Sequence, residues 1–519
     1  MQRVPATDTF EISWPDPEMA QAPWVGDRMH FPGPTAPLAQ RFVGNFMEQI
    51  LSAPTIFANG YEFSLPPTIP DPSPEVVAGG LDVWHDEYAP RIRAFCERIR
   101  ATDFDAMSIE ELAGALDGLA ADALDHARLT MVVIKRFMEP TFALLEFLER
   151  ELGADGPILS GTLLQGFQNA TTASGSGLDG LVAQAAGSPE LASALPGAGT
   201  AGLAELPGGA AFLEAFDSYL DDFGWRVETW GSMHVPTWAE QPEAALTLIG
   251  RYLSSPRQRP GGEAEPTDGR NAALASVESR LSGEKLQEFR RLLETTLQHV
   301  AVSEDRARWQ LSIIGVMRLP LLALGRKLVE RGALDEAADV FYVDWEDAKR
   351  AATGSGDALR EAARAGKADF ARWQQLAPPP FLGVPPDPAA MPAETLPMVR
   401  HFFGLGPPAV DAGVISGVGA SRGTVTGRAR VIRQLDESDR LETGDVMVCV
   451  TTAPPWTALF AIAGAVVTDT GGVMSHSAIC AREFSIPCVV GTQVGTRMIP
   501  DGAMITVDGE AGTVTILPS

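Results

Sequence analysis

Residues 464–491 contain the feature that most limits how this chain can fold. A short apolar run leads into a glycine turn and then into a helical pattern that begins near His476. A strand, a turn and a helix start in that order place the imidazole beside unpaired backbone N–H groups. Such a helix start binds anions, phosphate above all, and its dipole favours a neutral, nucleophilic ring. We predict that His476 is the reactive group and that the phosphate-cradling residues are Thr468, Gly471, Gly472, Ser475 and Ser477.

The spacing of apolar residues divides the chain into three parts. Through residue 377 the pattern is mostly helical, whereas 378–412 begins with a proline-rich stretch that predicts a semi-rigid linker or hinge. Short strand-like runs follow in 413–519, at 424–431, 446–450, 465–468, 488–490 and 504–507. We therefore predict a multidomain α plus α/β protein, in which a large helical region precedes a compact domain.

Three stretches interrupt the helical region. Residues 171–209 are rich in Gly, Ala and Ser, which predicts an exposed loop with short helices, with a lid as the alternative. Residues 256–268 predict a polar turn or a disordered insertion, and 339–342 predict a short extended segment.

Charge and cysteine content exclude several classes of function. A net charge of −27 argues against nucleic acid and anionic membrane surfaces as partners. Four cysteines without a CxxC pair indicate neither a disulfide framework nor a zinc site, so we expect no metal. The acidic N-terminus is unlike a secretory signal, and no apolar run is long enough to span a membrane. These features predict a cytoplasmic protein.

Residues 468–491 also resemble the swivelling phosphohistidine domain of the PEP-utilising and dikinase family. The matching positions are Thr468, Gly471, Gly472, Ser475, His476, Ala478, Ile479, Ala481, Arg482, Glu483, Ile486, Pro487, Val489, Val490 and Gly491. The flanks 417–431, 444–456 and 507–514 look like the remaining strands and turns of that domain. The sequence departs from the plant-type dikinases at Met474, where they carry a regulatory threonine, so phosphorylation there is not expected.

Short motifs in the helical region are similar to the acceptor-binding region of proteins like rifampin phosphotransferase. They lie at 30–38, 59–63, 223–226, 237–242 and 339–347. The resemblance implies that residues 1–377 bind the acceptor, and the acceptor-site candidates are His30, Arg226 and His234. The alternatives are that Arg226 pairs with Asp221 or Asp222 and that His30 caps a turn. The many aromatic residues of this region line a pocket for an aromatic or alicyclic alcohol or form ordinary core.

The resemblance further implies a dikinase-type reaction with His476 as the phosphorylated intermediate and no covalently bound cofactor. No glycine-rich phosphate loop with a downstream lysine precedes the carrier segment, and the sequence stops soon after it. We expect a split enzyme whose separate ATP-grasp partner holds ATP and Mg²⁺, with a small hydroxylated substrate as acceptor. The alternatives are a PEP-dependent carrier like the sugar-transport enzyme I and a regulator with a vestigial carrier domain.

Overall fold

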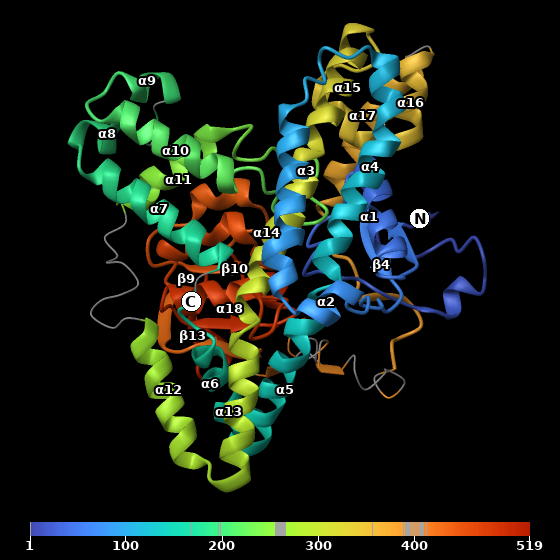
Figure 1. Ribbon diagram of the computed structural model, residues 1–519. Helices are drawn as coiled ribbons and strands as arrows, with labels where there is room; N and C mark the ends of the chain where they lie inside the picture. Colours follow the sequence, from blue (N-terminus) through green and yellow to red (C-terminus); the bar gives the residue numbers. More distant parts are fainter. Residues whose placement is uncertain are drawn as a thin grey trace. The chain divides into compact units, whose positions relative to one another are not determined.

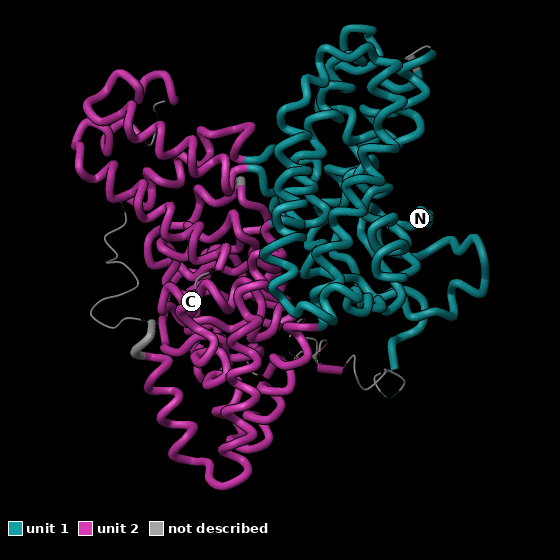
Figure 2. Tube along the Cα trace, viewed as in Figure 1, with its two compact units in different colours: residues 1–135, 225–237, 309–390 teal, residues 136–224, 238–308, 391–519 magenta. Residues whose placement is uncertain are grey.

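The computed structural model describes residues 2–518 except 168, 196, 198, 255–265, 355–356, 388, 390–395, 398, 400, 402, 404–408 and 412. Much of the polar stretch 256–268 therefore lies outside the described residues. The chain forms two compact units, coloured separately in Figure 2. Unit 1 consists of Met1–Lys135, Trp225–Thr237 and Trp309–Ala390, and unit 2 of Arg136–Gly224, Trp238–Arg308 and Met391–Ser519. Each unit is described by itself.

Unit 1 combines helices with a small sheet. Its helices include α1 (Pro37–Gln49), α2 (Pro74–Gly79), α3 (Ala89–Ala101), α4 (Ile109–Met131), α15 (Arg318–Glu330), α16 (Trp345–Thr353) and α17 (Asp357–Trp373). Helix α4 begins at a capping box in which Ser108 and Glu111 satisfy each other's backbone amides. Its apolar face, spaced at Ile109, Leu112 and Leu116, is buried as the helical periodicity predicts.

The sheet of unit 1 was not predicted from the sequence. Its described strands are ordered β1 (Gln2–Arg3), β3 (Thr55–Ala58), β4 (Tyr61–Ser64), β2 (Pro23–Val25) and β5 (Phe381–Gly383). Asn59 and Gly60 take positive φ at the tip of the β3–β4 hairpin, the conformation that a two-residue hairpin turn requires. Strand β5 belongs to the predicted linker 378–412, whose remaining part is described only in places. The predicted extended segment 339–342 was wrong, because Ala337–Tyr342 is a 3-10 helix, η4.

Unit 2 begins with helices α5 (Ile134–Leu152) and α6 (Gly156–Leu163). The others are α7 (Ala170–Ala186), α8 (Pro189–Ala194), α9 (Thr200–Ala204), α10 (Gly209–Phe223), α11 (Pro242–Ser254), α12 (Pro266–Arg280) and α13 (Gly283–Leu297). The residues of α14 (Val300–Val316) are divided between the two units after Arg308. Helices α7, α10 and α11 pack side by side (Figure 1). The predicted loop was therefore wrong over 171–186, which lie in α7, whereas α8 and α9 are short helices of the kind predicted for 171–209. Leu178, Leu181 and Ala185 repeat at helical spacing and are buried, and this apolar stripe outweighs the low helix propensity of glycine and serine.

The carboxyl-terminal part of unit 2 is a mixed sheet. Among the described residues nine strands follow the order β6 (Ala409–Asp411), β7 (Val414–Ser416), β14 (Thr513–Ile516), β13 (Met504–Asp508), β9 (Thr424–Val431), β10 (Val446–Cys449), β11 (Ala465–Thr468), β12 (Cys488–Val490) and β8 (Val418–Ser421). Strands β9 to β12 run parallel, and the helix α18 (His476–Glu483) connects β11 to β12. The five predicted strands and the helix after Ser475 are confirmed, as is the α plus α/β class.

One apolar core joins this sheet to the helices of unit 2. Leu181, Phe216 and Leu246 on the helices belong to the same buried cluster as Met447 and Phe460 of the sheet domain. The carboxyl-terminal sheet with its connecting helices, called the sheet domain below, therefore packs against the helices of unit 2. The contact is an apolar seam of the kind that forms domain cores.

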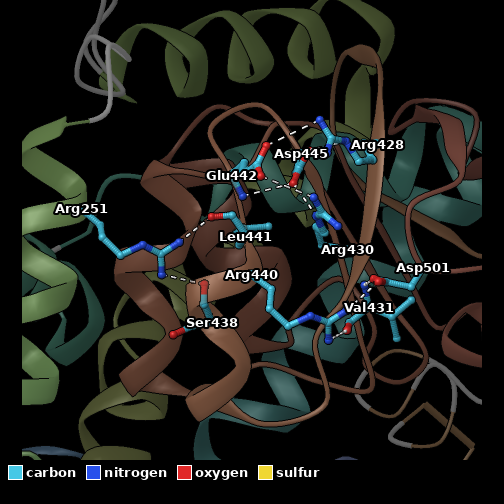
Figure 3. Close-up of polar contacts among 10 residues, drawn as sticks. All are labelled: Arg251, Arg428, Arg430, Val431, Ser438, Arg440, Leu441, Glu442, Asp445 and Asp501. Carbon is cyan, nitrogen blue, oxygen red and sulfur yellow. Dashed lines mark hydrogen bonds and ion pairs between the residues drawn. The ribbon is translucent and has the colours of Figure 1, made fainter.

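Two polar anchors accompany the apolar seam. Arg251 of α11 donates to the carbonyl oxygens of Ser438, at 2.6 Å, and Leu441, at the end of the 3-10 helix η7 (Leu435–Arg440) (Figure 3). The Gln165 amide donates to the Arg482 carbonyl at 2.6 Å, and the Gly166 N–H donates to Glu483 at 3.0 Å. Hydrogen bonds from two helical segments therefore supplement the apolar contacts.

Candidate functional site

His476 is the first residue of α18, directly after strand β11 and its glycine turn. The hydroxyl of Ser475 accepts the Ala478 N–H at 3.4 Å and caps the helix. Because neighbouring strands β10 and β11 are parallel, the loops after their carboxyl ends meet at one edge of the sheet. This topology brings Thr452, in the loop after β10, next to His476.

The His476 ring is held on several sides. Its Nδ1 lies 3.0 Å from the Thr452 hydroxyl, which is also 2.8 Å from the hydroxyl of Ser477. Its Nε2 lies 3.3 Å from the sulfur of Cys480, one turn along α18, and the Phe460 ring lies edge-on at 6.3 Å. Burial raises the pKa of Cys480 well above its ordinary value, so this sulfur stays a thiol and a weak hydrogen-bond partner. The half-buried imidazole thus has the Thr452 hydroxyl at Nδ1 and the Cys480 sulfur at Nε2.

The predicted phosphate-cradling residues have separate structural roles in this conformation. Ser475 and Ser477 lie beside His476, but the Thr468 hydroxyl donates to the Thr470 carbonyl at 2.7 Å. Gly471 has a φ of +94°, which favours glycine, and its N–H donates to the Phe403 carbonyl at 3.0 Å. The Gly471 amide is therefore already engaged by a backbone oxygen.

Gly472 and Asp469 fix the rest of the turn. A Cβ at Gly472 would lie 1.9 Å from the carbonyl oxygen of His401, so only glycine permits this close approach. Asp469 accepts hydrogen bonds from Thr492, at 3.2 Å, and from the backbone and hydroxyl of Thr496. The turn that precedes His476 is consequently held in one conformation from both sides.

The acceptor-site candidates all lie in unit 1. His30 Nδ1 is 2.6 Å from the carboxylate of Asp27, and the His30 ring stacks on Trp230 with centroids 4.1 Å apart. Phe31 and Phe46 meet Trp230 edge-on, and a Cβ at Gly231 would lie 2.9 Å from the Thr35 hydroxyl. The structure therefore brings together the segment around residues 30–38 and the segment 225–237.

His234 lies on that second segment and is half-buried. Its ring contacts Phe370 and Tyr342 edge-on, with centroids 4.7 and 6.4 Å away. Burial, with a smaller effect of the Arg318 charge, lowers the pKa of His234 to about 4, so the ring is neutral at pH 7. Arg226 is also buried on this segment, whereas Asp222, one of its expected partners, hydrogen-bonds Arg308.

Asp27 has two further ionisable neighbours, neither of which was singled out from the sequence. The buried Glu62 accepts the Asp27 N–H at 3.1 Å, and its pKa is raised to about 8 by burial first and by the Asp27 charge second. The Arg28 guanidinium lies over the rings of Tyr61 and Phe63, 5.1 and 4.7 Å from their centroids. Residues far apart in sequence thus form one charged cluster, which a linear motif does not reveal.

The described residues contain neither a candidate membrane span nor a candidate metal cluster. No described helix is long and apolar enough to cross a membrane. Within the same described part of the chain, His, Cys, Asp and Glu side chains do not gather in threes as metal ligands would.

Two segments of the chain match described protein families. Residues 441–512 match the mobile domain of the PEP-utilising enzymes, and residues 129–304 match the fourth domain of rifampicin phosphotransferase. The first match contains His476 and Thr452, and the second contains helices α6 to α13. The chain therefore combines a segment similar to the mobile domain of the PEP-utilising enzymes with a segment similar to the fourth domain of rifampicin phosphotransferase.

Individual relatives agree with this class. Chondramide synthase cmdD of Chondromyces crocatus is 31% identical over 565 residues, which cover 99% of this chain and 14% of that protein. The uncharacterized phosphotransferase YvkC of Bacillus subtilis is 31% identical over 60% of this chain and 37% of its own length. The rifampicin phosphotransferase of Streptomyces sviceus is 31% identical over 61% of this chain and 36% of its own. The chain thus spans little more than a third of the phosphotransferases that it matches.

Proposed function

We propose that this chain is the carrier and acceptor-binding part of a phosphotransferase. His476 accepts a phosphoryl group derived from ATP and transfers it to a hydroxyl group of a small molecule. The observation that carries this proposal is the half-buried His476 ring at the start of α18, oriented by Thr452 inside the segment that matches the mobile domain. The relatives named as phosphotransferases support the same reaction class.

The loading step follows from the ring's contacts. Because Nδ1 is engaged by Thr452, Nε2 supplies the electron pair that forms a P–N bond to the β-phosphorus of ATP, and the bond from that phosphorus to the oxygen of AMP breaks. Water then cleaves the bond between the β- and γ-phosphoryl groups, so inorganic phosphate leaves and one phosphoryl group remains on Nε2. The helix N-terminus, Ser475 and Ser477 would donate to the phosphoryl oxygens. We place ATP and Mg²⁺ on a separate ATP-grasp partner, with AMP and inorganic phosphate as the other products.

The acceptor is proposed to bind unit 1. Arg226 would attract the phosphoryl group, His30 would orient or deprotonate the acceptor hydroxyl, and the neutral His234 would serve as a hydrogen-bonding wall residue. The aromatic surroundings of Trp230 suit an aromatic or alicyclic alcohol. Rifampicin is the first compound to try, because relatives bear its name.

A labelling experiment tests the carrier. Phosphoramidate, a chemical phosphoryl donor to histidine, is applied to the wild type and to His476→Ala, and the site is read by mass spectrometry. ATP with a candidate ATP-grasp partner and PEP are compared as biological donors. We expect label on His476 alone and ATP-dependent, not PEP-dependent, loading. Full transfer to an acceptor by His476→Ala would refute the proposal.

A further inference from the structure

Asp27 and His30 form a tightly coupled pair whose geometry restricts the imidazole to one tautomer. The carboxylate Oδ2 lies 2.6 Å from His30 Nδ1, while Oδ1 accepts the backbone N–H groups of Met29 and His30, each at 3.0 Å. An ionised carboxylate can only accept hydrogen bonds, so Nδ1 must carry a proton. In a neutral ring the basic electron pair is then on Nε2.

The charge state of the cluster supports this assignment. Burial alone raises the pKa of Asp27, but the charge and hydrogen bonds of His30 and the Met29 amide outweigh it, and the net pKa is lowered. The neighbouring Glu62 is neutral at pH 7. Of the two carboxyl groups, Asp27 and Glu62, Asp27 is therefore the one that remains ionised, and it contacts the His30 ring.

The ring is also fixed in orientation. Trp230 stacks on it at an interplanar angle of 24°, and the side chains of His30 and Asp27 are only 19% and 16% exposed. A hydrogen bond to a charged group is stronger in such a partly desolvated place than in water. These are the features of a general base that a carboxylate positions.

A second histidine of unit 1 shows that similar residues do not by themselves produce this arrangement. His126 stacks on Phe95 and approaches Asp122, but its Nδ1 is 2.8 Å from the Asp122 backbone carbonyl of its own helix. The Asp122 carboxylate is 3.2 Å from that nitrogen and also binds Arg98. His126 is thus tied to a helix, and Asp122 is a matched control for Asp27.

We propose that His30, positioned by Asp27, is the general base for the acceptor hydroxyl, an assignment that rests on the proposed function. The O–H bond of the acceptor breaks and its proton moves to His30 Nε2. The oxygen electron pair forms the new bond to phosphorus, and the P–N bond to His476 breaks with its electrons returning to that ring. The His30 imidazolium then releases its proton to water. Asp27 is a positioning residue, because its carboxylate accepts the Nδ1–H and so directs Nε2 to take up the proton.

If His30 is the general base, the loss of transfer rate on removing Asp27 should depend on the acidity of the acceptor hydroxyl. A hydroxyl group that ionises easily needs less help from a base than one that does not. The acceptors chosen are phenol and the more acidic 4-nitrophenol. If Asp27 serves proton transfer, its loss should harm transfer to phenol more than transfer to 4-nitrophenol. A merely structural role would reduce both equally.

The experiment measures single-turnover transfer from full-length protein whose His476 has been loaded with phosphoramidate. We expect Asp27→Asn to lower the transfer rate to phenol about 10- to 100-fold with little change in KM, and His30→Gln to lower it about 100-fold or more. Asp27→Glu should restore part of the rate, and Asp122→Asn should behave as wild type. Equal losses for both phenols, or no loss in Asp27→Asn, would overturn the proposal.

Nitrogen-15 NMR of histidine-labelled protein tests the general-base role of His30 separately from the proposed phosphotransferase function. The wild type should show an Nδ1–H tautomer for His30, which Asp27→Asn loses. An Nε2–H tautomer in the wild type overturns the assignment even if transfer occurs. If neither phenol nor rifampicin accepts phosphate from labelled His476, the acceptor class fails and the base role fails with it, whatever the tautomer.

Discussion

The Thr452 hydroxyl lies 3.0 Å from Nδ1 of His476, although 24 residues separate them in the sequence. The same hydroxyl is 2.8 Å from that of Ser477, so the two side chains and the ring form a short chain of hydrogen bonds. This chain sets the ring plane before any phosphate arrives, which lowers the entropic cost of loading.

Replacing Thr452 should therefore slow the loading of His476. Thr452→Val keeps the side-chain shape but removes the hydroxyl, whose hydrogen bond contributes about 1 kcal/mol or more. We expect loading by phosphoramidate to slow about fivefold or more, while Thr452→Ser retains most of the rate. Stopped-time mass spectrometry measures both. Equal rates for the valine variant and the wild type would show that the contact has no role in loading.

Helix α7 was predicted as a loop because of its composition, and substitution of its glycines tests whether the segment is helical. Gly180 is exposed in this helix, and a Cβ there would meet no atom within 4 Å. Gly180→Ala should stabilise the protein by about 0.5–1 kcal/mol, because alanine loses less backbone entropy on folding. Urea unfolding measures the change. Gly177→Ala is the control, since its Cβ would lie 2.9 Å from the Tyr219 ring, and it should stabilise less or destabilise.

Sequence patterns predicted the strands and helix of the sheet domain well, but they predicted the helical region before it only in part. The strands of the sheet domain are short apolar runs bounded by glycine and aspartate, so local pattern and fold agree. Helix α7 was missed because its glycine and serine content hides three well-spaced apolar positions, Leu178, Leu181 and Ala185. Within the site His476 could be selected from its own segment. Thr452 and Asp27 could not, because the first depends on strand order and the second on burial.

Because of Glu62, the free energy of unfolding should decrease as the pH rises from about 4.5 to about 8. Its pKa is about 8 in the folded protein and 4.5 ordinarily, so between these values the folded state holds a proton that the unfolded state has lost. The stabilising contribution is complete below about pH 4.5 and disappears as the pH rises through about 8, at a slope of up to about 1.4 kcal/mol per pH unit. Glu62→Gln should flatten this part of the stability curve. Urea unfolding across pH 5 to 8 measures it against the surface variant Glu87→Gln, and identical slopes in both variants would contradict the prediction.

The last prediction concerns how the sheet domain is released from the helices of unit 2. If the carrier must leave these helices to be loaded, then Arg251, which fixes η7 by two carbonyl contacts, opposes loading. Arg251→Met keeps much of the aliphatic length but removes the hydrogen bonds, so the undocked fraction should rise severalfold. We expect faster amide hydrogen exchange in residues 435–441 and faster loading of His476 by an ATP-grasp partner.

Arg428→Met is the matched control for Arg251→Met. Arg428 pairs with Glu442 and Asp445 inside the sheet domain, so its loss breaks ion pairs within that domain without touching the helices (Figure 3). The apolar seam remains in both variants and keeps the domain mainly docked, because Met447 and Phe460 stay buried in the shared core. If both variants load at the same rate, Arg251 does not restrain the carrier. If Arg251→Met loads more slowly, the docked state is itself the form that accepts phosphate.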